Sequence, residues 1–229
     1  MWVGGGEKFG FINQPKAAFV NFFMFVKSII PLLDAAGIAE AQSIVDAHQA
    51  TSSTILNSMW ARKMGFPRDV PQAASLPVWL ELEALLGAHP TDYIILFREL
   101  MRVLTLDAAV DDVVATLAPA FYSPLPSTIA MQWKAWIGKW LAALRAAGVD
   151  AAAAAETMRT TNPKYILREW MLVEAYTACE KGDNAPLLEL HRVCKTPYDD
   201  QPEVDSRFYK RQPEPAELKG GTCSMTCSS

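Results

Sequence analysis

Apolar side chains recur at three- and four-residue intervals along most of this chain, between shorter stretches that contain proline and glycine. This spacing places apolar side chains on one face of an α-helix, whereas a half-buried β-strand alternates apolar and polar residues. The sequence contains no convincing alternating stretch and no internal repeat. We therefore predict an all-α fold, with one domain favoured over two for the 229 residues.

The predicted helices are bounded by residues that commonly begin, cap or interrupt helices. Gly65 is expected in the left-handed conformation after a helix, and Asn162 is expected to cap a helix that begins at Pro163. Three prolines make residues 67–77 a predicted connection. The apolar spacing predicts helices at about residues 19–30, 38–64, 78–86, 93–104, 106–117, 127–147, 163–181 and 186–193.

Three segments of the chain differ in composition. Residues 1–10 are rich in glycine and are predicted to form a loose N-terminus, and residues 11–195 form the predicted helical domain. From residue 196 onward proline, glutamine, glutamate and glycine dominate the sequence. Residues 196–229 are therefore predicted to form an extended tail that ends in Cys-Ser-Ser.

Charge and hydropathy argue against two classes of partner. The net charge is −4 and no run of five basic residues occurs, so a nucleic-acid-binding surface is not expected. The most apolar stretch, residues 17–33, is shorter than the roughly 20 residues that span a bilayer, and Asn21, Lys27 and Pro31 interrupt it. A buried core helix is favoured over a membrane span, and no signal peptide is recognised. The chain is predicted to be soluble and intracellular, which its four cysteines also favour over a secreted disulfide framework.

Two patterns that could carry chemistry have a simpler interpretation. His191 and Cys194 share a predicted helix, but zinc needs four ligands brought together, so a metal site is not favoured. Trp133, Trp136 and Trp140 could stack on nucleic-acid bases. Their helical spacing instead favours a packed core.

Cys227 and Cys223 are the candidate redox residues. Cys227 is the third residue from the end of the sequence, in a segment that is not expected to be buried, and Cys223 lies four residues before it. An exposed thiol can exchange with another thiol, and a local disulfide is sterically conceivable if the segment bends. From chemistry alone, an unreactive tail cysteine is equally well supported.

Several stretches together, in this order, resemble one known family. They are Phe-Gly-Phe-Ile-Asn-Gln-Pro at residues 9–15, Met-Trp-Ala-Arg-Lys-Met-Gly at 59–65, Asp-Tyr-Ile-Ile-Leu-Phe-Arg-Glu-Leu at 92–100, Asn-Pro-Lys-Tyr-Ile-Leu-Arg-Glu-Trp at 162–170, Pro-Tyr-Asp-Asp-Gln-Pro-Glu at 197–203, and the terminal Cys-Ser-Ser. The set resembles the C-terminal part of the selenoprotein O family, which are kinase-like protein adenylyltransferases. Glu169 is a departure, because asparagine is usual at that place in the family.

The resemblance implies a protein-kinase-like fold that uses ATP and magnesium to transfer AMP to hydroxyl side chains of protein substrates. In that family the Lys–Glu pair, the phosphate-binding arginines, the Asp base and the metal-holding Asn and Asp all precede the Asn-Gln-Pro stretch. No catalytic, cofactor-binding or metal-binding residue is therefore assigned to this chain. The resemblance implies that the nucleotide-binding half lies N-terminal to residue 1, that the chain is inactive alone as a truncated product, and that the absent N-terminal lobe covers apolar surface.

The resemblance also bears on Cys227 and on the compartment. Cys227 matches a position that is selenocysteine in some members and cysteine in others, which implies a redox-regulatory role. Eukaryotic relatives imply a mitochondrial location. Two alternatives stand beside the enzyme hypothesis: a non-catalytic helical binding module, and a thiol-redox helper that acts through Cys227.

Overall fold

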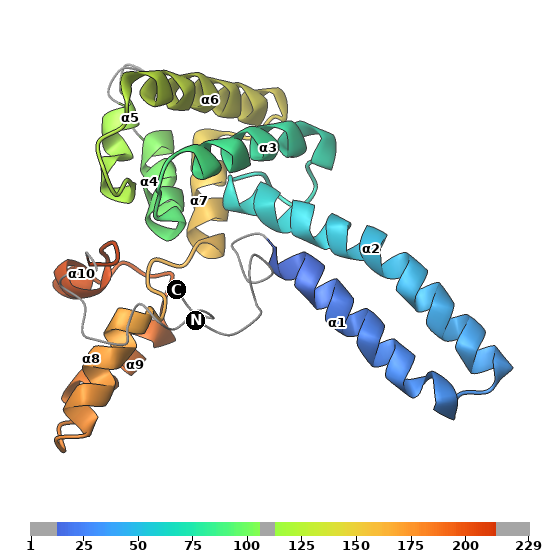
Figure 1. Cartoon of the computed structure of the whole chain (residues 1–229). Helices are drawn as coiled ribbons and strands as arrows, with labels where there is room; N and C mark the ends of the chain where they lie inside the picture. The colour runs from blue at the N-terminus through green and yellow to red at the C-terminus, as the bar shows by residue number, and fades with distance from the viewer. Residues whose placement is uncertain (1–12, 106–112, 214–229) are drawn as a thin grey trace. The chain divides into compact units, whose positions relative to one another are not determined.

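The computed structural model describes residues 13–105 and 113–213, and these residues are helical with short connections (Figure 1). Within these two ranges no β-strand forms, and the one bridge pairs Thr91 with Phe121. The prediction of an all-α class is confirmed. Packing divides the chain into two units, with a boundary after residue 57 that falls inside the predicted domain of residues 11–195.

The first unit contains a helical hairpin. It consists of α1 (Gln14–Ile29), the 3₁₀ turn η2 (Ile30–Leu32) and most of α2 (Ala35–Lys63). The two helices of the hairpin are separated at Leu33, whose backbone is extended. Asp34 then caps α2, because its Oδ1 accepts the backbone N–H of Gly37 at 2.8 Å.

The helix α1 was predicted to be a buried core helix, and this prediction is wrong for the described residues. Gln14–Leu32 is long and apolar enough to cross a membrane by length and composition alone, yet only 6% of its most apolar window is buried. Val26 is the single buried residue of α1. Within the described part of its unit, α1 has only the hairpin partner α2 to pack against, so most of its surface stays open.

The second unit contains the remaining helices. They are α3 (Gln72–Ala88), α4 (Tyr93–Thr105), α5 (Val113–Thr116), the 3₁₀ turn η3 (Ala118–Ala120), α6 (Ser127–Ala146), α7 (Ala151–Thr161), α8 (Glu169–Cys179), α9 (Ala185–Lys195) and α10 (Pro202–Phe208). Closely packed pairs are α3 with α6, α4 with α7, and α8 with α9. The left-handed turn predicted at Gly65 is observed, with a φ of +89°. Gly182 also has a positive φ, of +84°, and Asp92 Oδ1 accepts the N–H of Ile95 at the start of α4.

The tryptophan stripe of α6 lies in the core, as the spacing predicts. Trp133, Trp136 and Trp140 are exposed by 2% or less, and the rings of Trp136 and Trp140 stack with centroids 5.8 Å apart. Trp136 Nε1 donates to the carbonyl of Val78 at 2.9 Å, and Trp140 Nε1 donates to the carbonyl of Met64 at 2.8 Å. These rings therefore join α6 to α3 and to the end of α2, and the alternative of a base-stacking surface is not supported.

Two predicted boundaries are wrong. Residues 72–77 belong to α3, and Pro77 lies inside that helix rather than in a connection. The lost backbone hydrogen bond is offset because Val78 and Trp79 directly after it are buried. Asn162 ends α7 instead of beginning the next helix, and α8 begins only at Glu169, because the side chain of Asn162 contacts a different element.

The predicted extended tail is wrong for its first part. Pro202–Phe208 forms α10, with Pro202 in the first turn, where its missing N–H costs little. Val204 and Phe208 lie four residues apart, and both are buried. They complete an apolar cluster with Tyr165, Met171, Leu190 and Val193. Burial of these two side chains is the physical reason why a segment rich in polar residues and proline becomes helical.

Candidate functional site: a buried polar network

The predicted redox residues cannot be placed, because Cys223 and Cys227 lie outside the described residues. Cys179 and Cys194, in α8 and α9, are free and half-buried, and burial raises the pKa of the Cys194 thiol. Across residues 13–105 and 113–213, no group of three or more His, Cys, Asp or Glu side chains is arranged to hold a metal ion.

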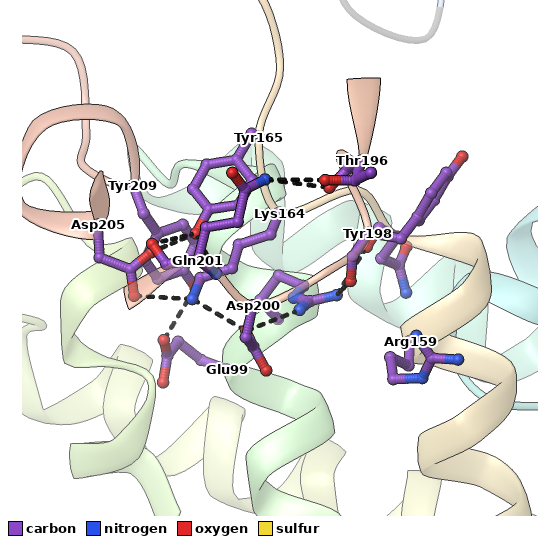
Figure 2. A network of polar contacts seen from close by, with 12 residues as sticks. Glu99, Arg159, Lys164, Tyr165, Thr196, Tyr198, Asp200, Gln201, Asp205 and Tyr209 are labelled. Atoms are coloured by element: carbon purple, nitrogen blue, oxygen red, sulfur yellow. Dashed lines mark hydrogen bonds and ion pairs between the residues drawn. The ribbon is translucent and has the colours of Figure 1, made fainter. Parts of the chain in front are cut away.

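Polar side chains gather where α4, the end of α7 and the segment 196–209 meet (Figure 2). We call this set the polar network, and its members are Lys63, Arg98, Glu99, Asn162, Lys164, Tyr165, Asp200, Gln201, Asp205 and Tyr209. Buried polar groups are costly unless they are hydrogen-bonded, so the partners of each member decide what the network does.

Arg98 and Glu99 are adjacent in α4, and both are buried, with exposures of 3% and 2%. Arg98 donates through Nη1 to the carbonyl oxygens of Asn162 at 3.2 Å and Tyr198 at 3.4 Å, and through Nη2 to Asp200 Oδ1 at 3.3 Å. One guanidinium group therefore holds the end of α7 and the segment before α10 against α4.

Glu99 faces a different set of donors. Its Oε2 accepts from Arg102 at 2.7 Å, and its Oε1 accepts the hydroxyl of Tyr209 at 3.0 Å. Burial, followed by the neighbouring Glu99 carboxylate, raises the pKa of Tyr209 well above its usual value. The phenol thus stays protonated and donates to the carboxylate, which ties the end of α10 to α4.

Lys164 lies between two carboxylates. Its Nζ is 2.9 Å from Asp200 Oδ1 and 2.7 Å from Asp205 Oδ2. Burial by itself lowers the pKa of Lys164, but the hydrogen bonds to Asp205 and Asp200 outweigh it and raise that pKa. The hydrogen bond from Lys164 lowers the pKa of Asp200 against a smaller opposing effect of burial. Both groups are therefore charged at neutral pH and form an ion pair, although the side chain of Asp200 is 70% exposed.

Tyr165 and Gln201 connect the network to the apolar cluster around α10. The hydroxyl of Tyr165 donates to Asp205 Oδ1 at 2.5 Å and accepts the backbone N–H of Gln201 at 3.0 Å (Figure 2). Gln201 Nε2 donates to the carbonyl oxygens of Val193 at 3.1 Å and Thr196 at 3.2 Å. Burial raises the pKa of Tyr165, so this phenol also remains a donor.

Lys63 and Asn162 join α2 to α7 at the other side of the network. Asn162 Nδ2 donates to the carbonyl of Lys63 at 2.9 Å, and Lys63 Nζ donates to Asn162 Oδ1 at 3.2 Å. The ammonium of Lys63 also lies over the ring of Phe97, 5.1 Å from its centroid. Burial lowers the pKa of Lys63 to about 8.

A separate ion pair fixes the start of α4. Arg168 donates through Nη1 to Asp92 Oδ2 at 2.6 Å and through Nη2 to Asp92 Oδ1 at 2.9 Å. Asp92 is 5% exposed and also accepts the N–H of Ile95. The extended segment after Asn162 is thereby held against the first turn of α4.

The arrangement acts as a clamp between segments that are distant in the sequence, and the cations Arg98, Lys164 and Arg168 are each paired with carboxylates of this chain. The polar network and the Asp92–Arg168 ion pair bring together four stretches of the sequence, residues 59–65, 92–100, 162–170 and 197–203. The apolar periodicity did not predict this contact. One signal was available: Arg98 and Glu99 are neighbouring charges in a short helix with apolar residues on most sides.

Comparison with known proteins identifies the family. A family model described as "Protein adenylyltransferase SelO" matches residues 4–195 of the chain. A protein nucleotidyltransferase YdiU of Flavobacterium johnsoniae is 30% identical over 225 residues, which are 97% of this chain and 42% of the relative. The protein of the same name from Aromatoleum aromaticum is 30% identical over 98% of this chain and 42% of its own length. A third relative, from Salmonella paratyphi B, is 28% identical over 97% of the chain.

The family match covers most of the helical part of the chain, from α1 to α9, and ends before α10. The chain spans 42% of the length of the curated relatives it matches. By this match, the chain belongs to the family of the protein adenylyltransferase SelO.

Proposed function

We propose that this chain forms the helical C-terminal part of a kinase-like protein adenylyltransferase, and that the ATP and magnesium site is supplied by polypeptide outside the chain. The observation that carries the proposal is the family match over residues 4–195, combined with coverage of only 42% of the relatives. The proposed role of these helices is to support the catalytic half and to present protein substrates to it.

The proposed reaction needs positive charge near the phosphates, whereas cations in and beside the polar network form ion pairs within this chain. A hydroxyl oxygen of the protein substrate attacks the α-phosphorus of ATP, the bond to the β-phosphate oxygen breaks, and pyrophosphate leaves while the hydroxyl proton passes to a base. Cations around the phosphates stabilise such a transition state. Arg98, Lys164 and Arg168 are paired internally, which supports a scaffolding role for the chain.

Two measurements with labelled ATP and magnesium test the proposal. The purified chain alone is expected to transfer no AMP to protein, with the intact Flavobacterium johnsoniae relative as the comparison protein. A chimaera in which this chain replaces the matching segment of that relative is expected to transfer AMP. Label transferred by the chain alone, or a folded chimaera with no activity beside an active parent, would overturn the proposal.

A further inference from the structure

The helix α1 carries apolar residues on all sides but is almost uncovered. Val20, Met24 and Phe25 are exposed by 49%, 58% and 61%, and Leu32 just after α1 is exposed by 83%. We call these four residues the α1 surface. A helix that is hydrophobic all round is normally buried in a large protein or in a membrane. Exposed apolar patches of this kind mark interaction sites.

The contact with α2 uses a different side of the helix. Phe19 and Phe22 pack against His48 of α2, with ring centroids 5.5 Å and 4.6 Å away. At about 100° per residue, Met24 lies roughly 140° around the helix from Phe19, so the side that holds α2 cannot also cover it. Phe25 lies about 60° from Phe22, at the edge of that contact, and is still 61% exposed. The hairpin therefore closes over one side of α1 and leaves the α1 surface free for another occupant.

The length of the relatives favours a polypeptide as that occupant. The alignments cover 97% and 98% of this chain, so the relatives carry a segment equivalent to α1. In them that segment belongs to a protein more than twice as long, because the matched part is 42% of their length. A lipid surface is less favoured, since Asn21 and Lys27 interrupt the apolar residues of α1.

The charges of α1 indicate the chemistry of the partner surface. Lys16 and Lys27 are its only charged residues, and α1 contains no Asp or Glu. We propose that the α1 surface docks on the remaining part of the family protein, against an apolar patch rimmed by acidic side chains. This inference rests on the proposed function, because it takes the rest of that protein as the partner of this chain.

Substitutions made both in the free chain and in the chimaera test the docking. Phe25→Lys is expected to leave the melting temperature of the free chain unchanged, because the side chain is already exposed. In the chimaera described above it is expected to lower that temperature by about 3 °C or more. Leu188→Lys is the matched control, since Leu188 on α9 is 64% exposed, and it should change neither protein.

Hydrogen exchange gives a second measurement. Amides of residues 14–32 should exchange at least tenfold more slowly in the chimaera than in the free chain, and the equivalent segment of the intact relative should be protected to the same degree. That relative provides the measurement even if the chimaera does not fold.

Three results would overturn the docking proposal: unprotected α1 amides in both longer proteins, a dimer of the free chain that Phe25→Lys dissociates, or flotation of the free chain with vesicles that Phe25→Lys abolishes. The outcome is separable from that of the proposed function. Protection of α1 in a chimaera that transfers no AMP supports docking and counts against the activity. Transfer of AMP with α1 fully exposed counts against docking alone.

Discussion

The side chain of Asn162 makes both of its polar contacts with one residue, Lys63, which is 99 positions away in the sequence. Its amide nitrogen donates to the Lys63 carbonyl, and its amide oxygen accepts from the Lys63 ammonium. The last turn of α2 needs partners for its carbonyl groups, and Asn162 supplies one of them. A single buried amide thus holds α2 and α7 together.

Replacement of Asn162 is expected to destabilise the chain. Asn162→Ala leaves the carbonyl and the half-buried ammonium of Lys63 without these partners, and an unsatisfied buried group costs about 1–3 kcal/mol. Urea unfolding should report the loss. Asn21→Ala is the control, because Asn21 is exposed, and it should change the free energy of unfolding by less than about 0.5 kcal/mol. Equal effects of the two substitutions would contradict the clamp.

The pKa of Lys63 makes stability depend on alkaline pH. It is about 8 in the folded chain against 10.5 for an ordinary lysine, so between these values the unfolded chain binds more protons. The contribution of Lys63 to stability is therefore lowest below pH 8 and rises as pH increases toward 10.5. The full rise is at most about 3 kcal/mol.

Lys63→Met removes the titrating group and isolates this contribution. The difference in unfolding free energy between the parent chain and the variant should shift in favour of the parent as pH rises from 8 to 10.5. Urea titrations at several pH values in this window measure the shift. A difference that stays constant with pH would show that Lys63 is not desolvated.

Gly65 is constrained by its backbone and by its neighbour. Its φ is +89°, and a Cβ there would lie 3.0 Å from the Cβ and 3.1 Å from the carbonyl oxygen of Ala154. Gly148 also has a positive φ, of +72°, but its Cβ would meet nothing within 4 Å. Gly148→Ala should therefore cost about 1–2 kcal/mol, and Gly65→Ala should cost at least about 1 kcal/mol more. Thermal unfolding of both variants checks the order.

The helix α10 should depend on its two buried apolar side chains. Phe208→Ala removes a side chain that is 4% exposed, and a loss of about 3–5 kcal/mol is typical of such a change. Amides of residues 202–208 should then exchange faster than in the parent chain. Ser206→Ala, at an exposed position of the same helix, should leave their exchange unchanged. If the amides of residues 202–208 exchange fast in the parent chain itself, the result would support the prediction of an extended tail over the helix α10.

Cys227 remains the candidate for thiol chemistry. Under oxidising conditions, peptide mass spectrometry is expected to find it in a disulfide, with Cys223 as the partner within this chain. Cys227→Ser should abolish that product and leave Cys179 and Cys194 free. A Cys227 thiol that persists at high oxidant concentration would remove the redox hypothesis.

The sequence by itself determined the helical class, most helix centres, the left-handed turn at Gly65, and the burial of the α6 tryptophans. These follow from residue spacing and local conformational preference, which act within a few residues. The tertiary structure decided where α8 begins, that residues 202–208 are helical, and that Arg98 and Glu99 are buried together. Each of these depends on groups that are far apart in the sequence. Lys63 binds the side chain of Asn162, and Phe208 packs in an apolar cluster formed by other helices. Asp200 pairs with Arg98, and Tyr209 donates a hydrogen bond to Glu99. Local sequence contains no information about such partners, so only the packed fold assigns them.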